Sequence, residues 1–161
     1  RPGEYMIAET YIDTGIMVKS YVFEADSPAA IAIIEAAGEP LIFSHVHALD
    51  IPNAIRLKRF RGEITAGEET AAVRAFRADV DAGRLARLDY DLPAVFIRAE
   101  ALSAKHSGGI GSRSLDLLHV AEALEAGCTA FASFDDRQRK LAALADLKLI
   151  PAKHVAPATV R

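Results

Sequence analysis

The sequence predicts an α/β fold in which helices wrap a parallel sheet. Short β-rich runs alternate with alanine-rich helical stretches along the whole chain, which is the pattern of parallel strands joined by helical crossovers. The 161 residues, 51% of them hydrophobic, suit one globular domain with a sizeable core. Because no linker, repeat or low-complexity segment divides the chain, we expect a single domain over residues 6–155. Residues 1–5 (RPGEY) look like a leader or an added cloning sequence.

Five short apolar runs predict the strands of this sheet, because each is rich in aliphatic, aromatic or β-branched residues and is bounded by polar or turn residues. They are residues 10–12 (TYI), 40–45 (PLIFSH), 84–89 (RLARLD), 129–133 (TAFAS) and 147–152 (LKLIPA).

Six longer stretches predict the helices, and several of their ends carry capping signals. Ser27 at the N-cap, Pro28 after it and Gly38 past the end bracket one helix. Thr65 and Glu68 have the spacing of a capping box for another. The six stretches are residues 26–38, 52–62, 65–83, 92–108, 114–127 and 136–145.

Charge and cysteine content exclude several classes of protein. The net charge of −3 means that any nucleic-acid binding depends on a local basic patch rather than on an overall positive field. The single cysteine, Cys128, excludes an intramolecular disulfide framework and a CxxC motif, so we expect a reducing cytoplasm and a core role for its side chain. No apolar run approaches the roughly 18 residues of a membrane span, and the N-terminus lacks the apolar region of a signal peptide.

Two aspartates follow predicted strands. Asp13 comes directly after residues 10–12, and Asp135 comes shortly after residues 129–133. Because the carboxyl ends of parallel strands share one edge of a sheet, where ligands bind in open α/β folds, we expect these carboxylates to lie close together. Asp136 is an alternative to Asp135, although it suits the N-cap of the last helix better.

Asp116 and Asp50 are further candidates, each with a structural alternative. Asp116 lies in the first turn of the helix at 114–127, where it either favours the helix start through the helix dipole or joins the site. Asp50 precedes Pro52, a residue that suits a first helical turn. Asp50 is therefore either the N-cap of a helix that begins at Ile51 or a ligand.

Three or four carboxylates that converge repel one another unless a positive group joins them. All-oxygen ligand sets favour Mg²⁺ or Mn²⁺, and such ions activate water and stabilise the displaced oxygen in phosphodiester hydrolysis. The four aspartates are therefore candidate metal ligands of a hydrolase.

Four segments resemble, in order, the acidic blocks of PIN-domain ribonucleases of the VapC-type toxin group. They are YIDTGIMVKSY, SHVHALDIPNAIRLKRFRGEIT, RSLDLLHVAEAL and TAFASFDDRQRKLAA, and the resemblance runs from about Met6 to Ile150. It implies a three-layer α/β/α sandwich with a central parallel sheet, Mg²⁺- or Mn²⁺-dependent endoribonuclease activity, a homodimer and, for toxins, a neutralising antitoxin. Carried over by position, the catalytic and metal-binding residues are Asp13, Asp50, Asp116 and Asp135.

Two positions depart from the family pattern. The second block usually has a glutamate inside its helix, and here it has the shorter Asp50 followed by Ile51 and Pro52. The first block usually reads Thr-Ser, and here it reads Thr14-Gly15. If Asp50 is too short to reach an ion, Asn53 on the same helix face supplies an alternative oxygen.

Basic side chains near the acids are candidates to hold an RNA phosphate. Arg113 lies one turn before Asp116, and Arg137 follows Asp135. A second basic cluster either binds RNA or an acidic antitoxin segment, or is a solvated helix face; it comprises Arg56, Lys58, Arg59 and Arg61.

Two other interpretations remain open. His45 and His47, expected to alternate on a strand, imitate with Asp50 part of the HxHxxD spacing of zinc hydrolases. The chain is also compatible with a degenerate PIN-like domain that binds RNA or a protein without cleaving. We expect His119, three residues after Asp116, to pack or to form a hydrogen bond on its helix.

Overall fold

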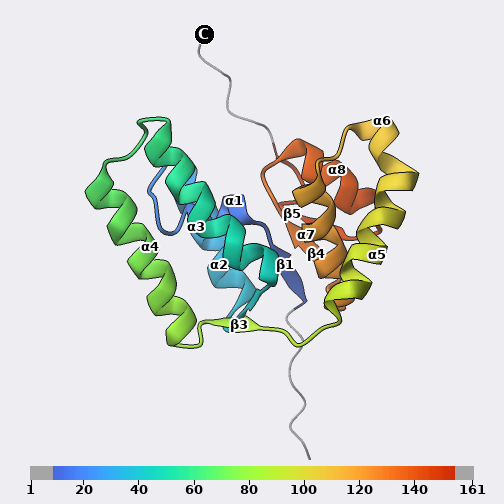
Figure 1. Cartoon of the computed structure of the whole chain (residues 1–161), viewed down its shortest axis with the longest axis horizontal. Coiled ribbons are helices and arrows are strands. Elements are labelled where there is room, and N and C mark those ends of the chain that lie inside the picture. The colour runs from blue at the N-terminus through green and yellow to red at the C-terminus, as the bar shows by residue number, and fades with distance from the viewer. Residues whose placement is uncertain (1–8, 155–161) are drawn as a thin grey trace, which may run out of the picture.

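Parallel strands run through the middle of the fold, and helices lie on either side of them (Figure 1). The structure is a computed structural model that describes residues 9–154. The residues expected to form a leader, and both expected ends of the domain, lie outside this range. The strands are β1 (Thr10–Ile12), β2 (Leu41–Phe43), β3 (Leu85–Arg87), β4 (Ala130–Ala132) and β5 (Lys148–Ile150).

The helices divide into two groups that flank the strands (Figure 1). A π-helical segment, η1 (Ser103–Ser107), joins α5 to α6. In the described part of the chain, no helix is both long enough and apolar enough to cross a membrane. The helices are α1 (Thr14–Val18), α2 (Ser27–Ala37), α3 (His45–Phe60), α4 (Ala66–Asp81), α5 (Leu92–Leu102), α6 (Gly108–Ile110), α7 (Ser114–Glu125) and α8 (Asp136–Leu144).

Neighbouring residues of a strand point alternately into two hydrophobic cores. Successive strand residues point to opposite faces of a sheet. Ile12 therefore packs with residues of α1 to α4, whereas its neighbour Tyr11 packs with residues of α5, α7 and α8. Ala132 and Phe131 of β4 divide in the same way. The predicted parallel sheet with helices on both faces is confirmed.

The strand order places a crevice at the ends of β1 and β4. One hydrogen-bonded ladder has the order β1-β4-β5 and the other pairs β2 with β3. β2 also contacts β1, so β1 has β4 on one side and β2 on the other. In open α/β sheets, ligands bind beyond the carboxyl ends of the strands at such a reversal. Asp13 and Ser133 are the first residues after these two strands.

Helix α3 begins earlier than the sequence predicted. Ser44 is its N-cap: Ser44 Oγ accepts from His47 N at 3.0 Å, and His47 Nδ1 accepts from Ser44 N at 3.2 Å. Asp50 is consequently inside the helix, so its interpretation as an N-cap is wrong. His45 and His47 lie in the first helical turn rather than on a strand. The error arose because Pro52 suggested a first turn, although the helix continues through it.

Three smaller differences concern the ends of two helices and one short helix that was not predicted. α2 begins at Ser27, with Asp26 rather than Ser27 in the N-cap position. The helical run that starts with α5 continues past Gly108 and ends at Gly111, whose φ of 66° is the left-handed conformation that glycine adopts readily. α1 was not predicted, because five residues are too few to show helical periodicity.

Replacing Ser44 tests the start of α3. Ser44→Ala removes the cap of a buried helix end, so we expect the free energy of unfolding to fall by about 1–2 kcal/mol. Thr70→Ala is the control, because Thr70 Oγ1 donates to Ala66 O inside α4 and caps nothing. Urea denaturation of both variants measures the difference. A loss smaller than about 0.3 kcal/mol for Ser44→Ala would contradict the assigned cap.

Candidate active site

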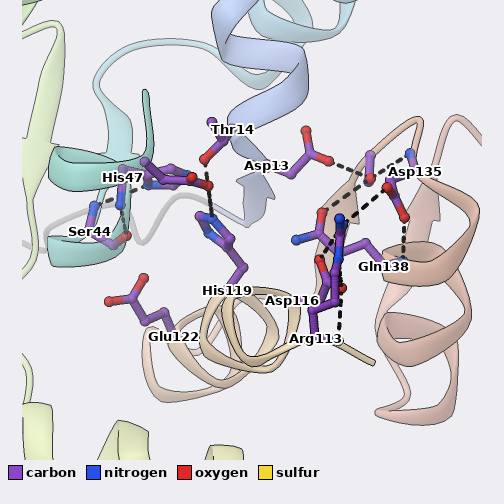
Figure 2. A network of polar contacts seen from close by, with 12 residues as sticks. Asp13, Thr14, Ser44, His47, Arg113, Asp116, His119, Glu122, Asp135 and Gln138 are labelled. Atoms are coloured by element: carbon purple, nitrogen blue, oxygen red, sulfur yellow. Dashed lines mark hydrogen bonds and ion pairs between the residues drawn. The ribbon is translucent and has the colours of Figure 1, made fainter. Parts of the chain in front are cut away.

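Four aspartates from separate parts of the chain line one cleft at the carboxyl ends of β1 and β4. Asp13 follows β1, Asp50 lies inside α3, Asp116 lies in the first turn of α7 and Asp135 precedes α8. The cleft has a volume of about 510 Å³. Its other polar lining residues include Thr14, Asn53, Arg113, Ser114, His119 and Gln138. The four acids singled out in the sequence therefore converge in the fold, and Figure 2 shows three of them around Arg113.

Asp13 caps a helix and also lies in the cleft. Its Oδ1 accepts from Ile16 N at 2.8 Å, which makes it the N-cap of α1, and its Oδ2 accepts from Ser133 Oγ. The residue is only 4% exposed. Burial raises the pKa of Asp13, and the hydrogen bonds from Ser133 and Ile16 offset this only in part. The roles of cap and cleft residue are thus compatible at this position.

Asp135 likewise caps a helix, α8, and lines the cleft. Its Oδ1 accepts from Arg137 N at 2.9 Å and from Gln138 N at 3.0 Å. Its Oδ2 faces Arg113 Nη2 at 3.6 Å. The expectation that Asp136 caps this helix is wrong, because Asp136 is already its first residue.

Arg113 neutralises Asp116. Arg113 Nε donates to Asp116 Oδ2 at 3.0 Å, and Nη2 donates to Oδ1 at 3.2 Å. The backbone N–H of Arg113 also donates to Oδ2, at 3.1 Å. Asp116 raises the pKa of Arg113, so the guanidinium stays charged. This guanidinium lies between the carboxylates of Asp116 and Asp135.

Asp50 is held by side chains from two other elements. Its Oδ2 accepts from His119 Nε2 at 3.0 Å, and Thr14 is its second hydrogen-bond partner. Partial burial works to raise the pKa of Asp50, but the hydrogen bonds from His119 and Thr14 outweigh it and the pKa is lowered. Asp50 is therefore ionised at neutral pH.

Sequence reasoning missed three contributors to the cleft. Ser133 and Gln138 hold Asp13 and Asp135 in place around the end of β4, and His119 contacts Asp50. The position of Ser133 at the carboxyl end of a predicted strand was a usable signal. No local pattern links His119 to Asp50, which lies 69 positions earlier.

The histidines do not support a zinc site. His47 is fully buried; its Nε2 donates to Ile12 O at 2.8 Å and its Nδ1 accepts from Ser44 N, so both ring nitrogens are engaged. Burial, together with His119 nearby, lowers the pKa of His47 to about 3. His45 instead lies at the surface against Tyr90. His47 thus lies in the core and His45 at the surface, so the two histidines do not converge on one metal ion.

Basic residues line two hollows that adjoin the cleft. Arg113 and Arg137 line an adjoining hollow of about 460 Å³ together with Asp135 and Lys140. Lys58 and Arg61 of the other predicted basic cluster line the second hollow, which contains none of the four aspartates, and Lys58 is paired there with Glu24 and Glu63. The basic surface next to the acids is therefore the one around Arg113 and Arg137.

The sequence matches the family model of the PIN domain over residues 10–144. The chain belongs to the PIN domain family. No individually curated protein matches it significantly. PIN domains are generally nucleases that act on RNA or DNA, and they generally use divalent metal ions. The match is to the family as a whole rather than to its VapC-type toxin group.

The cleft has the donor chemistry that such an ion requires. Within residues 9–154, no three carboxylate, imidazole or thiol groups are placed to hold one metal ion in this conformation. The carboxylate oxygens are nevertheless the ligand type preferred by hard divalent ions. A positive group also fits between Asp116 and Asp135, because the Arg113 guanidinium already lies there. The oxygen ligands of this cleft therefore match the chemistry of such an ion, with the Arg113 guanidinium in the position between Asp116 and Asp135.

The raised pKa of Asp13 predicts a pH-dependent gain from Asp13→Asn in metal-free buffer. Asparagine still caps α1, and the substitution removes a buried charge. Because the folded-state pKa lies above the unfolded value, the wild type loses stability as pH rises through the folded pKa. We therefore expect Asp13→Asn to be the more stable protein at pH 7, with the difference shrinking as pH falls towards 4.

Urea denaturation across this pH range in EDTA measures the effect. Asp13→Ala is the control, since it loses the cap and should be less stable than Asp13→Asn by about 1 kcal/mol. A lower stability of Asp13→Asn than of wild type at pH 7 would show that the Asp13 charge stabilises the fold.

Proposed function

We propose that this PIN domain is a Mg²⁺- or Mn²⁺-dependent endoribonuclease that hydrolyses RNA phosphodiester bonds. The observation that carries the proposal is the convergence of four aspartates from four separate elements on one cleft, beside a basic surface. Carboxylates gathered at one sheet edge lower the stability of the fold. A positively charged ligand that binds there explains why the fold brings them together.

The acids have the ligand role in this proposal. Asp13, Asp50, Asp116 and Asp135 hold the ion through carboxylate oxygens. A bound ion of this kind lowers the pKa of a water molecule and stabilises the oxygen that leaves phosphorus. One oxygen of Asp13 and one of Asp135 accept backbone N–H groups, which fixes the direction of the other oxygen.

The cleft rim binds the substrate. Arg113 and Arg137 contact the phosphates of the RNA strand, since guanidinium groups match phosphate oxygens in charge and geometry. Thr14 and Asn53 line the same cleft and add polar contacts. Arg113 thereby exchanges its carboxylate partner for a phosphate when ion and RNA enter.

Cleavage of a mixed RNA pool tests the proposal. Purified protein should cleave the pool with Mn²⁺ and stop on addition of EDTA. Asp116→Asn should lower the rate by at least about 100-fold, because one ligand loses its charge. Asp89→Asn is the control: it removes an exposed acid that lines neither the acidic cleft nor the adjoining hollow, and it should keep wild-type activity. Normal cleavage by Asp116→Asn would refute the assignment.

Removal of Arg113 is expected to raise metal affinity. The bidentate pair between the exposed Arg113 side chain and the buried Asp116 carboxylate contributes about 1 kcal/mol that an entering ion must replace. Arg113→Gln should therefore bind Mn²⁺ roughly fivefold more tightly while binding RNA more weakly. Isothermal titration calorimetry measures the first effect and a filter-binding assay the second.

Arg137→Gln is the control for Arg113, because it removes an equal charge from the same rim. It should weaken RNA binding with a much smaller change in Mn²⁺ affinity. Equal gains in Mn²⁺ affinity for both variants would assign the effect to net charge rather than to the Asp116 pair.

The biological setting follows from the resemblance to VapC-type toxins. We propose a cytoplasmic toxin that forms a homodimer and is neutralised by an antitoxin protein. Exposed large hydrophobic side chains offer surfaces for such partners; they include Phe23, Phe60, Phe96 and Ile97. Light scattering of the purified protein tests the dimer, and growth arrest on expression tests toxicity.

A second candidate is a degenerate PIN-like module that binds RNA or protein without cleaving. The observation that favours it is the pairing of each carboxylate with a donor of the protein itself. RNA binding that survives EDTA, without cleavage in Mn²⁺, would support this alternative over the nuclease.

A further inference from the structure

His119 connects the acidic cleft to buried polar groups behind it. Its Nε2 lies 3.0 Å from Asp50 Oδ2 and 3.2 Å from Thr14 Oγ1. Because the ionised Asp50 carboxylate can only accept, Nε2 carries the proton of that bond. The side chain of His119 is 2% exposed and that of Asp50 is 19% exposed. The bond therefore runs from the core to the cleft surface.

Tyr11 fixes the other side of the imidazole ring. His119 Nδ1 lies 2.8 Å from Tyr11 Oη. The same hydroxyl lies 3.1 Å from Ser44 Oγ and donates to Glu122 Oε2 at 3.0 Å. Since Tyr11 is fully buried, the His119 ring cannot rotate without breaking buried hydrogen bonds.

Glu122 anchors this arrangement one turn after His119 on α7. It is 1% exposed and accepts from both Tyr11 and Tyr90. A buried carboxylate is costly unless its oxygens are hydrogen-bonded, so both tyrosines are held in turn. Figure 2 shows Glu122 and His119 on the same helix, with Thr14 at the far end of the His119 ring.

His47 is a natural comparison, because it is equally buried and its ring centroid lies 5.0 Å from that of His119. Its ring nitrogens contact backbone groups, Ile12 O and Ser44 N. These bonds tie the start of α3 to the end of β1, which is a structural role. The bonds of His119 lead instead to a carboxylate in the cleft.

We propose that His119 is a positioning residue that holds the Asp50 carboxylate in its orientation at the cleft, with Tyr11 and Glu122 holding His119. This inference rests on the proposed function, in which Asp50 is a ligand. An aspartate without such a donor samples other rotamers, and an ion must then order it on binding. Loss of a residue that orients a metal ligand typically lowers metal affinity by about 10- to 100-fold.

Two substitutions of His119 separate positioning from packing. In His119→Gln the side-chain amide reaches the place of Nε2 and still donates to Asp50. In His119→Asn the shorter amide reaches only the place of Nδ1. We expect His119→Asn to weaken Mn²⁺ binding about tenfold and His119→Gln by less than about threefold, as measured by calorimetry on the full chain.

His47→Asn is the matched control, because it also removes a buried histidine. It should lower the melting temperature and leave Mn²⁺ affinity unchanged. Wild-type Mn²⁺ affinity in His119→Asn would overturn the positioning role and leave a structural one. If His119→Asn does not fold, Tyr11→Phe decides, since it removes only the hydroxyl that holds the ring: unchanged Mn²⁺ affinity in this variant would also overturn the proposal.

A double-mutant cycle with Asp50→Asn distinguishes this inference from the proposed function. Asp50→Asn should weaken Mn²⁺ binding, and adding His119→Asn should have no further effect, because His119 acts through Asp50. Additive losses would overturn the positioning role. If Asp50→Asn binds Mn²⁺ as wild type does, the ligand role of Asp50 fails and the positioning role fails with it. If Asp50→Asn weakens binding but His119→Asn does not, only the positioning role fails.

Discussion

The need to satisfy four carboxylates gathered at one sheet edge is the constraint on which the rest of this structure depends. Three kinds of donor offset the four acids: helix N-terminal amides for Asp13 and Asp135, a guanidinium for Asp116 and an imidazole for Asp50. Two helices start where an acid needs amide donors, and a third starts next to the arginine that pairs with Asp116. The same local structures that start these helices therefore also satisfy the carboxylates of the cleft.

Structural and functional interpretations of an acid are consequently not exclusive in this fold. Asp13 shows this most clearly, because one oxygen caps α1 while the carboxylate as a whole lines the cleft. Asp50 shows the opposite case, since it was a plausible cap in the sequence and caps nothing in the fold. Whether an aspartate near a helix start is a cap depends on which residue before it has an extended backbone, and Ser44 has that conformation here.

Local signals in the sequence were sufficient for the strands and most helices, and they marked Asp13 and Asp135. The choice of Asp50 and Asp116 as site residues over their structural alternatives came from the resemblance to PIN-domain ribonucleases. Apolar runs identified β1 and β4, and the shared edge of parallel strands predicted that Asp13 and Asp135 lie close together. The start of α3 was placed too late because Pro52 suggested a first helical turn and Ser44 was assigned to the preceding strand. The contact between His119 and Asp50 was not predictable, because it depends on how α3 packs near α7 rather than on any pattern within either helix. Pairings formed by tertiary packing leave no periodic trace in a single sequence.

The two halves of the cleft differ in how quickly they can rearrange. The side chain of Arg113 is 61% exposed and sits at the mouth of the cleft, so its release from Asp116 requires only rotation of a surface side chain, a motion on the picosecond to nanosecond timescale. His119 is enclosed by Tyr11 and Glu122, so reorientation there requires local opening of the core, which is slower by orders of magnitude. The arginine side of the cleft is therefore the labile one, and the histidine side is the rigid one.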